Sequence, residues 1–271
     1  MKRLRIVAAA LACLSISPAL AIVVGAPPAP AILTRSVVMV VGSYGTLCTA
    51  TVIARDLLLT AAHCAQPDAQ CQFVDAESGR ETALKEIARI ARHPQFELKK
   101  LFAHLPTADI ALLKLAGPLA PQFLPLPLDM RTPPAAAGEL ITVAGYGVAM
   151  RGKADSGGML RAAALVAATG PDALQIRLVD PRTRGKRAGL GACTSDSGAP
   201  ALRGNGDGLA VIGLVSWSTG PNMGGGCGGV TGVTALAPYA DWIVETARGL
   251  GSALTPASWL GVSAAAPALA A

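Results

Sequence analysis

Short runs of apolar and β-branched residues, separated by Gly, Pro and Asp, recur along most of the chain after residue 21. We predict strands at 36–41, 48–53, 57–60, 110–115, 140–144, 174–179 and 209–216. Many short strands with turn signals between them are typical of an all-β barrel or sandwich. A Pro-rich stretch at 118–134 divides these strands into two halves of similar length. The pattern therefore indicates two β units joined by a crossover.

The only helix that the pattern predicts lies near the end of the chain, at 238–248. Pro238 suits a first helical position, and Gly249 is a stop signal. The apolar face of this helix is formed by Tyr239, Trp242, Ile243 and Ala247. The remaining residues, 250–271, are mostly Ala, Ser and Pro, and we expect a poorly ordered tail.

The first 21 residues have the pattern of a secretory signal. Lys2, Arg3 and Arg5 precede an apolar run at 6–16, and the small residues Ala19 and Ala21 predict cleavage after Ala21. The apolar run is shorter than the about 20 residues that a transmembrane helix needs, so we expect no stable membrane insertion. We therefore expect an exported protein, periplasmic or extracellular.

Composition and charge narrow the class of protein. With 52% hydrophobic and 15% charged residues, the chain is neither a disordered acidic tail nor a coiled coil. Loss of the three basic signal residues lowers the formal net charge from +6 to +3, which is a poor basis for nucleic-acid binding. A basic run at 182–187 is interpreted as a solvated loop, with steering of acidic substrates as the alternative.

The cysteines are interpreted in the light of export, because oxidising compartments favour disulfides. Cys13 leaves with the signal, and an odd number remains: Cys48, Cys64, Cys71, Cys193 and Cys227. The sequence has no Cys-x-x-Cys pair and only three His, so we expect no metal site. An alternative makes Cys13 a lipidated residue, and the chain would then be a lipid-anchored structural protein.

Three short motifs carry candidate chemistry. His63 lies in Thr-Ala-Ala-His-Cys at 60–64, Asp109 opens an apolar run at 109–115, and Ser197 lies in Cys-Thr-Ser-Asp-Ser-Gly-Ala-Pro at 193–200. A Ser hydroxyl is a weak nucleophile until a positioned base removes its proton. Histidine titrates near neutral pH and can accept that proton and return it. Each motif alone has an ordinary structural explanation.

Together, and in this order, the motifs resemble the trypsin/chymotrypsin-like serine proteases, and we expect a secreted member of the bacterial type. The resemblance begins at 22–25, includes 93–94 and 145–147, and continues through 215–217 to the closing helix. It implies an all-β fold of two six-stranded antiparallel Greek-key barrels, at about 22–125 and 135–235 of a domain covering 22–249. The active site is expected in the cleft between the barrels.

The resemblance also assigns roles to individual residues. It makes His63, Asp109 and Ser197 the catalytic triad, in which Asp109 fixes the imidazole tautomer. The oxyanion hole would consist of the Ser195 and Ser197 N–H groups. Ser195 departs from the family pattern, because it replaces a glycine and would strain a backbone that only glycine adopts easily. Ala199 replaces a second glycine, which is a milder change.

Further assignments concern the pocket, the disulfides and the N-terminus. The predicted specificity pocket is uncharged and consists of Gly191, Ala192, Ser216, Trp217, Ser218 and Gly229. The predicted disulfides are Cys48–Cys64 and Cys193–Cys227. Cys71 is left as a free thiol, with intermolecular pairing as the alternative. After signal cleavage, with no separate pro-segment, the Ile22 ammonium is expected to pair with Asp196.

The predicted function is that of a secreted serine endopeptidase that forms an acyl-enzyme and prefers neutral or apolar residues before the scissile bond. Its partners would be protein or peptide substrates. We expect a monomer without cofactor, metal or nucleic acid. The alternative, motivated by Ser195, is a catalytically weak homologue that binds protein or peptide in the same cleft.

Overall fold

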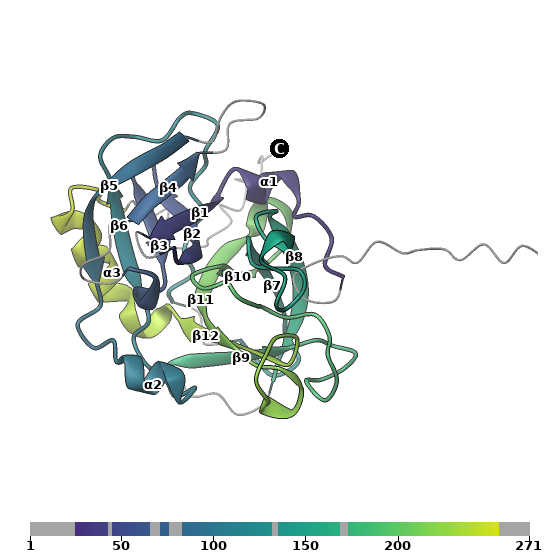
Figure 1. The fold of residues 1–271 in the computed structure, drawn as a ribbon. Coiled ribbons are helices and arrows are strands. Elements are labelled where there is room, and N and C mark those ends of the chain that lie inside the picture. The colour runs from purple at the N-terminus through teal and green to yellow at the C-terminus, as the bar shows by residue number, and fades with distance from the viewer. Residues whose placement is uncertain are drawn as a thin grey trace, which may run out of the picture.

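Two closed β-barrels make up most of the protein (Figure 1). The computed structural model describes residues 25–42, 45–65, 71–75, 83–131, 135–168 and 173–254, with the backbone alone at 71–75, 83–85 and 207. Over these residues the fold is all-β, with short helices at the edges. The prediction of two six-stranded antiparallel barrels and a C-terminal helix is confirmed.

The first barrel is built from the N-terminal half of the chain. Its strands are β1 (Val37–Gly42), β2 (Leu47–Ala54), β3 (Leu57–Thr60), β4 (Cys71–Asp75), β5 (Ala83–Arg92) and β6 (Ala111–Leu115). They pair in the order β1-β2-β3-β6-β5-β4, every pair antiparallel, and β4 closes the barrel on β1. The crossover from β3 to β6 gives the Greek-key order.

The second barrel repeats this plan. Its strands are β7 (Leu140–Gly145), β8 (Arg161–Ala167), β9 (Gln175–Val179), β10 (Pro200–Arg203), β11 (Ala210–Ser218) and β12 (Val230–Ala235). They pair antiparallel in the order β10-β11-β12-β9-β8-β7, and β7 closes on β10. Each barrel encloses its own cluster of buried apolar side chains.

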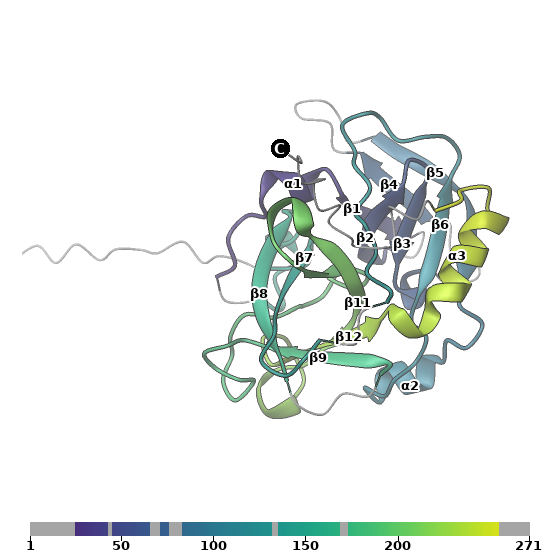
Figure 2. The same ribbon diagram turned by 180° about the vertical axis from the view of Figure 1, so that it is seen from behind.

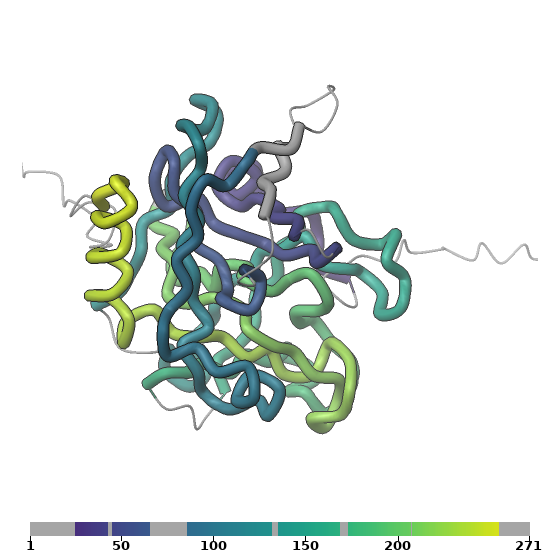
Figure 3. The backbone as a smooth tube through the Cα atoms, turned by 60° about the vertical axis from the view of Figure 1, so that its left-hand side comes forward, coloured from purple at the N-terminus to yellow at the C-terminus, as the bar shows by residue number. Residues whose placement is uncertain are grey.

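Helices lie outside the barrels. They are α1 (Ala31–Thr34), α2 (Leu98–Phe102) and α3 (Ala240–Gly249), with 3-10 turns that include Ala62–Cys64 and Ala237–Tyr239. The chain leaves β12 of the second barrel and returns to the first, where α3 lies beside β6 (Figures 2 and 3). Ile243 and Ala247 of α3 are fully buried in the apolar cluster shared by the two barrels. The helix therefore fastens the barrels together.

The packed chain continues past α3. Leu250 and Ser252, which belong to the predicted tail, are buried. The Ser252 hydroxyl donates to Asp56 Oδ1 over 2.6 Å and accepts from Lys114 Nζ over 2.5 Å. The rest of that predicted tail, 255–271, and the predicted signal both lie outside the described residues. No helix in the described part of the chain is long and apolar enough to cross a bilayer.

Candidate functional site

His63 and Asp109 meet at the edge of the first barrel. The 3-10 turn that carries His63 follows β3 directly, and Asp109 lies just before the neighbouring strand β6. His63 Nδ1 lies 2.8 Å from Asp109 Oδ2, and the His63 backbone N–H donates to Oδ1 over 2.9 Å. Because a carboxylate can only accept, Nδ1 carries the proton, and Nε2 of the neutral ring is the basic nitrogen. The pairing of β3 with β6 thus sets the tautomer.

Ser216 reaches this pair from the second barrel. Its hydroxyl donates to Asp109 Oδ2 over 2.6 Å, and Asp109 is fully buried. The place of Ser216 in the specificity pocket stays a prediction, and the structure adds that its side chain is turned toward Asp109. A buried carboxylate is stabilised by each donor it receives, and Asp109 receives three. This role could not be predicted from the sequence, because Ser216 lies inside a largely apolar strand.

The Ser197 turn is held against the first barrel. The Ser197 carbonyl accepts from the Thr49 N–H over 2.8 Å and lies 3.7 Å from Sγ of Cys64, the residue after His63. Gly198 has φ +80°, and a Cβ there would lie 2.2 Å from the Thr60 hydroxyl oxygen. Only glycine fits this close approach, which explains the Ser-Gly sequence. The structure therefore places Ser197 beside the turn of His63.

Ser195, which stands where the family pattern has a glycine, adopts a backbone conformation that suits glycine. Its φ is +75°, in the left-handed region that disfavours side chains. In the described part of the chain, neither the Ser195 N–H nor the Ser197 N–H has a protein acceptor. Both donors of the predicted oxyanion hole are thus available to a ligand. Ala199, the second residue that replaces a glycine of the family pattern, is fully buried against Gly145 and fits the packing there.

Asp196, between these two serines, lies against Gly145 and Gly147 at the end of β7. It is fully buried, and its carboxylate accepts from the Gly147 N–H over 2.8 Å and the Cys193 N–H over 2.9 Å. Burial raises the pKa of this carboxyl to about 6, although the two backbone N–H groups oppose the rise. The predicted partner, Ile22, lies outside the described residues.

Both predicted disulfides are present. Cys48 is bonded to Cys64, with Cα atoms 6.2 Å apart, and Cys193 to Cys227, with Cα atoms 5.0 Å apart. The first fixes the His63 turn to β2, and the second fixes the loop before Ser197. The side chain of Cys71 lies outside the described residues.

Comparison with known proteins decides the family. The family model described as Trypsin matches residues 22–243, which is most of the chain. The chain belongs to the trypsin family. This establishes the serine-protease and peptidase class at the level of the family.

Two relatives of this trypsin-family chain illustrate its distance from known members. It is 26% identical over 233 residues to snake venom serine protease rhinocerase 4 of Bitis rhinoceros, covering 82% of this chain and 86% of that protein. It is 30% identical over 220 residues to transmembrane protease serine 9 of Rattus norvegicus, covering 74% of this chain but only 19% of that protein. Both relatives are animal proteins and do not support the expectation of a bacterial-type member.

Two residues of the predicted pocket, Gly191 and Ala192, lie directly before Cys193 in this trypsin-family domain. A Cβ on Gly191 would lie 3.3 Å from both Gly228 Cα and the hydroxyl oxygen of Thr231. The same hydroxyl accepts from the N–H of the buried Ala192 over 2.9 Å. Thr231 was missed by the sequence analysis, since nothing marks it in its strand.

The other predicted pocket residues lie along β11 and the loop after it. Trp217 is stacked on His104, with ring centroids 4.5 Å apart, and Ser218 ends the strand half-buried. A Cβ on Gly229 would meet the Gly220 carbonyl oxygen at 1.9 Å. Gly229 thus serves close packing of two loop segments.

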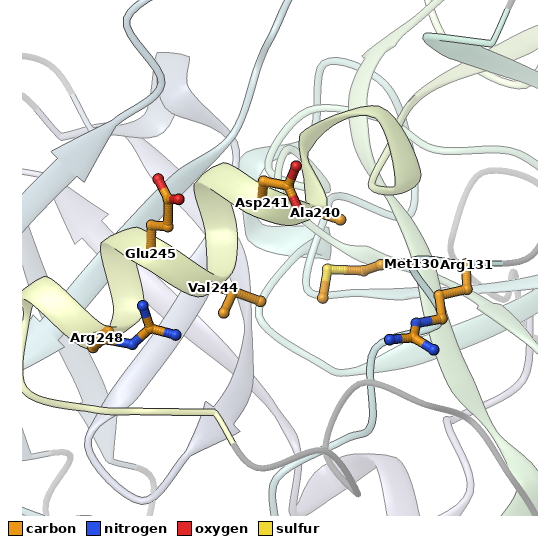
Figure 4. Close-up of a pocket in the computed structure, with 7 residues that line it drawn as sticks. All are labelled: Met130, Arg131, Ala240, Asp241, Val244, Glu245 and Arg248. Atoms are coloured by element: carbon orange, nitrogen blue, oxygen red, sulfur yellow. The ribbon is translucent and has the colours of Figure 1, made fainter.

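A separate surface cavity of about 380 Å³ lies on α3. Figure 4 shows its lining residues, which are Met130, Arg131, Ala240, Asp241, Val244, Glu245 and Arg248. None of them belongs to the predicted site, and their charges are of both signs. No function is assigned to this cavity.

Proposed function

We propose that this trypsin-family chain is an active, exported serine endopeptidase that cleaves protein or peptide substrates. The observation that carries the proposal is the Asp109-bound His63 beside the Ser197 turn, with two unused N–H donors next to it. In this proposal the mature protein is periplasmic or extracellular. That the protein is a bacterial-type member of the family remains a prediction, which rests on the resemblance alone.

The chemistry assigned to each residue follows from its position. His63 Nε2 removes the proton from the Ser197 hydroxyl, whose oxygen attacks the substrate carbonyl carbon. The resulting oxyanion accepts hydrogen bonds from the Ser195 and Ser197 N–H groups. His63 then returns the proton to the leaving amine, and an acyl-enzyme forms at Ser197. Water, activated by the same imidazole, then attacks the acyl-enzyme and releases the carboxylic acid product from Ser197.

Active-site labelling tests the proposal. A fluorophosphonate probe should modify the exported wild-type protein at Ser197, and Ser197→Ala should not be labelled. Ser197→Ala and His63→Ala should each abolish peptide hydrolysis, and the double variant should be little worse, because the members of a catalytic unit are not additive. Equal unfolding temperatures would show that the variants are folded. Substantial turnover in Ser197→Ala would exclude the triad.

The alternative is a catalytically weak homologue that binds peptides in the same cleft. It is favoured by one observation, the left-handed backbone at Ser195, which is strained for any residue other than glycine. Absence of labelling in a folded wild-type protein that still binds peptides would support this alternative.

For the specificity, we propose cleavage after neutral, mainly apolar residues. The atoms nearest to a Cβ on Gly191 are Gly228 backbone and the Thr231 hydroxyl, and no residue of the predicted pocket carries a carboxylate. An unpaired buried cation costs several kcal/mol, so Arg and Lys should be excluded. Cleavage-site profiling with a peptide library tests this, and a preference for Arg or Lys would refute it.

For the activation, we propose that signal cleavage after Ala21 frees the Ile22 ammonium to pair with Asp196. The buried Asp196 carboxylate supports this, because the described residues around it supply N–H donors but no cation. A chain made without the signal, but with a Met before Ile22, should be much less active than the exported protein. Equal activity would exclude the switch.

A further inference from the structure

Thr49 is a buried residue of β2 that joins the two barrels at the Ser195–Ser197 turn. Its N–H donates to the Ser197 carbonyl over 2.8 Å, and its hydroxyl donates to the Ser195 carbonyl over 3.0 Å. The same hydroxyl oxygen accepts from the Tyr146 N–H of the second barrel over 3.1 Å. Its side chain is fully buried, so water does not substitute for these partners.

The hydroxyl of Thr49 acts on one of the two peptide groups that flank Ser195. The peptide before Ser195 is held at its carbonyl, because Thr194 O accepts from the Val148 N–H over 2.9 Å. In a trans peptide the N–H points away from the C=O, so the direction of the Ser195 N–H changes with any tilt of this peptide about its single carbonyl hydrogen bond. The peptide after Ser195 is held at its carbonyl by the Thr49 hydroxyl and at its N–H, which belongs to Asp196, by the Cys193 carbonyl.

The backbone torsions φ and ψ of Ser195 relate these two peptides. The φ value of +75° is unfavourable for a serine, and such a conformation persists only where the surroundings hold it. Loss of the Thr49 bond would leave this second peptide held at its N–H end alone, which would let Ser195 leave the left-handed region. The first peptide would then turn as well, and the Ser195 N–H would no longer lie beside that of Ser197.

We propose that Thr49 is a positioning residue, whose hydroxyl holds Ser195 in the conformation that aims its N–H at the substrate oxyanion. The inference rests on the proposed peptidase function. It explains how a serine is tolerated at a backbone position that suits glycine, and it makes the oxyanion hole depend on a side chain of the other barrel.

The test compares Thr49→Val with a matched control on the same strand. Thr51→Val removes a hydroxyl that is equally buried and has no hydrogen-bond partner among the described residues. Oxyanion contacts strengthen in the transition state, so Thr49→Val should lower kcat with little change in KM. Loss of one oxyanion donor costs roughly 100- to 1,000-fold, and partial misplacement should cost about 10- to 100-fold. Thr49→Ser should recover most of the activity, and Thr51→Val should retain it.

A second measurement does not depend on activity. The Asp196 N–H, which donates to the Cys193 carbonyl over 3.1 Å, reports on the turn itself. Its hydrogen exchange, followed by NMR, should be faster in Thr49→Val than in Thr51→Val or the wild-type protein. If the wild-type protein is active and Thr49→Val keeps its kcat, the inference is wrong. If the wild-type protein is inactive, the proposed function fails separately, and unchanged Asp196 exchange would overturn the role of Thr49.

Discussion

Single residues at the Ser195–Ser197 turn show how the site departs from an unstrained arrangement. Ser195 keeps a left-handed backbone, and Asp196 between the two serines is a carboxylate buried beneath the turn. Both features cost free energy locally and persist only because neighbouring groups hold them. The turn is therefore the part of the molecule where small side-chain changes should have measurable effects on stability.

Replacement of Ser195 by glycine tests the strain directly. Glycine removes the penalty of about 1–2 kcal/mol for the left-handed region but loses more conformational entropy on folding, by about 0.5–1 kcal/mol. Ser195→Gly should therefore raise the free energy of unfolding by roughly 0.5–1 kcal/mol, measured by urea denaturation. Ser195→Ala keeps a Cβ and is the control, for which no gain is expected. Equal stability of the two variants would show that the turn is not strained.

At the scale of the elements, the sequence predicted strands where apolar residues run together. All seven predicted runs coincide with strands, for example 57–60 with β3 and 140–144 with β7. Five strands in the described part of the chain were missed, and several of them have mixed patterns: β5 carries charges without a strict alternation, β8 is rich in Ala, and β12 contains Gly232. Their pairing across the barrels overrides weak local propensity. The short α1 and α2 were missed because neither has a periodic pattern.

The site residues, like the strands, could be predicted only where the local sequence is distinctive. Motifs revealed His63, Asp109 and Ser197 because each lies in a distinctive local sequence. Thr49 and Ser216 could not be found in this way. Their bonds to Ser195 and Asp109 link positions 146 and 107 residues apart, and a lone hydroxyl in an apolar strand has no local signature.

Gly232 in β12 illustrates the packing that a strand pattern does not reveal. A Cβ at this position would lie 2.0 Å from the indole of Trp217 on the paired strand β11. Gly232→Ala should therefore displace the buried ring and lower the free energy of unfolding by about 1–3 kcal/mol. Thermal or urea unfolding would measure this loss.

Gly249→Ala is the matched control, because a Cβ there meets nothing within 4 Å and the residue ends helix α3. Alanine favours a helix over glycine by up to about 1 kcal/mol, so this variant should be neutral or slightly more stable. A Gly232→Ala protein as stable as Gly249→Ala would contradict the close packing of Trp217.

On the scale of the whole molecule, the candidate site is assembled from both barrels. Asp109 is hydrogen-bonded to Ser216 of β11, and Thr49 is hydrogen-bonded to the Ser195–Ser197 turn. Helix α3, which follows the last strand of the second barrel, packs in the apolar cluster that the two barrels share. Neither barrel alone contains His63 and Ser197. The chemistry therefore depends on the relative position of the barrels, which these contacts and the shared apolar cluster fix.

The buried charge of Asp196 should make stability depend on pH in the chain that has a Met before Ile22. Its pKa is raised by burial to about 6, so the folded chain holds this proton more tightly than the unfolded chain. The stabilising contribution is complete below the unfolded pKa, near 3.8, and is lost as pH rises through about 6. The chain with a Met before Ile22 should therefore lose of order 3 kcal/mol relative to its Asp196→Asn variant between pH 4 and pH 8.

The comparison with Asp196→Asn also removes the effect of other titrating groups. His93 is packed against Tyr239 and Trp242, and burial lowers the pKa of its imidazole. Its contribution changes in the opposite sense, being lost as pH falls through the lowered pKa, and it is the same in both proteins. Urea unfolding of the pair at pH 4 and pH 8 gives the difference. In the exported chain the proposed Ile22 ammonium would compensate the Asp196 charge, so the loss at pH 8 should be much smaller. An equal loss in both forms would show that no ammonium reaches Asp196.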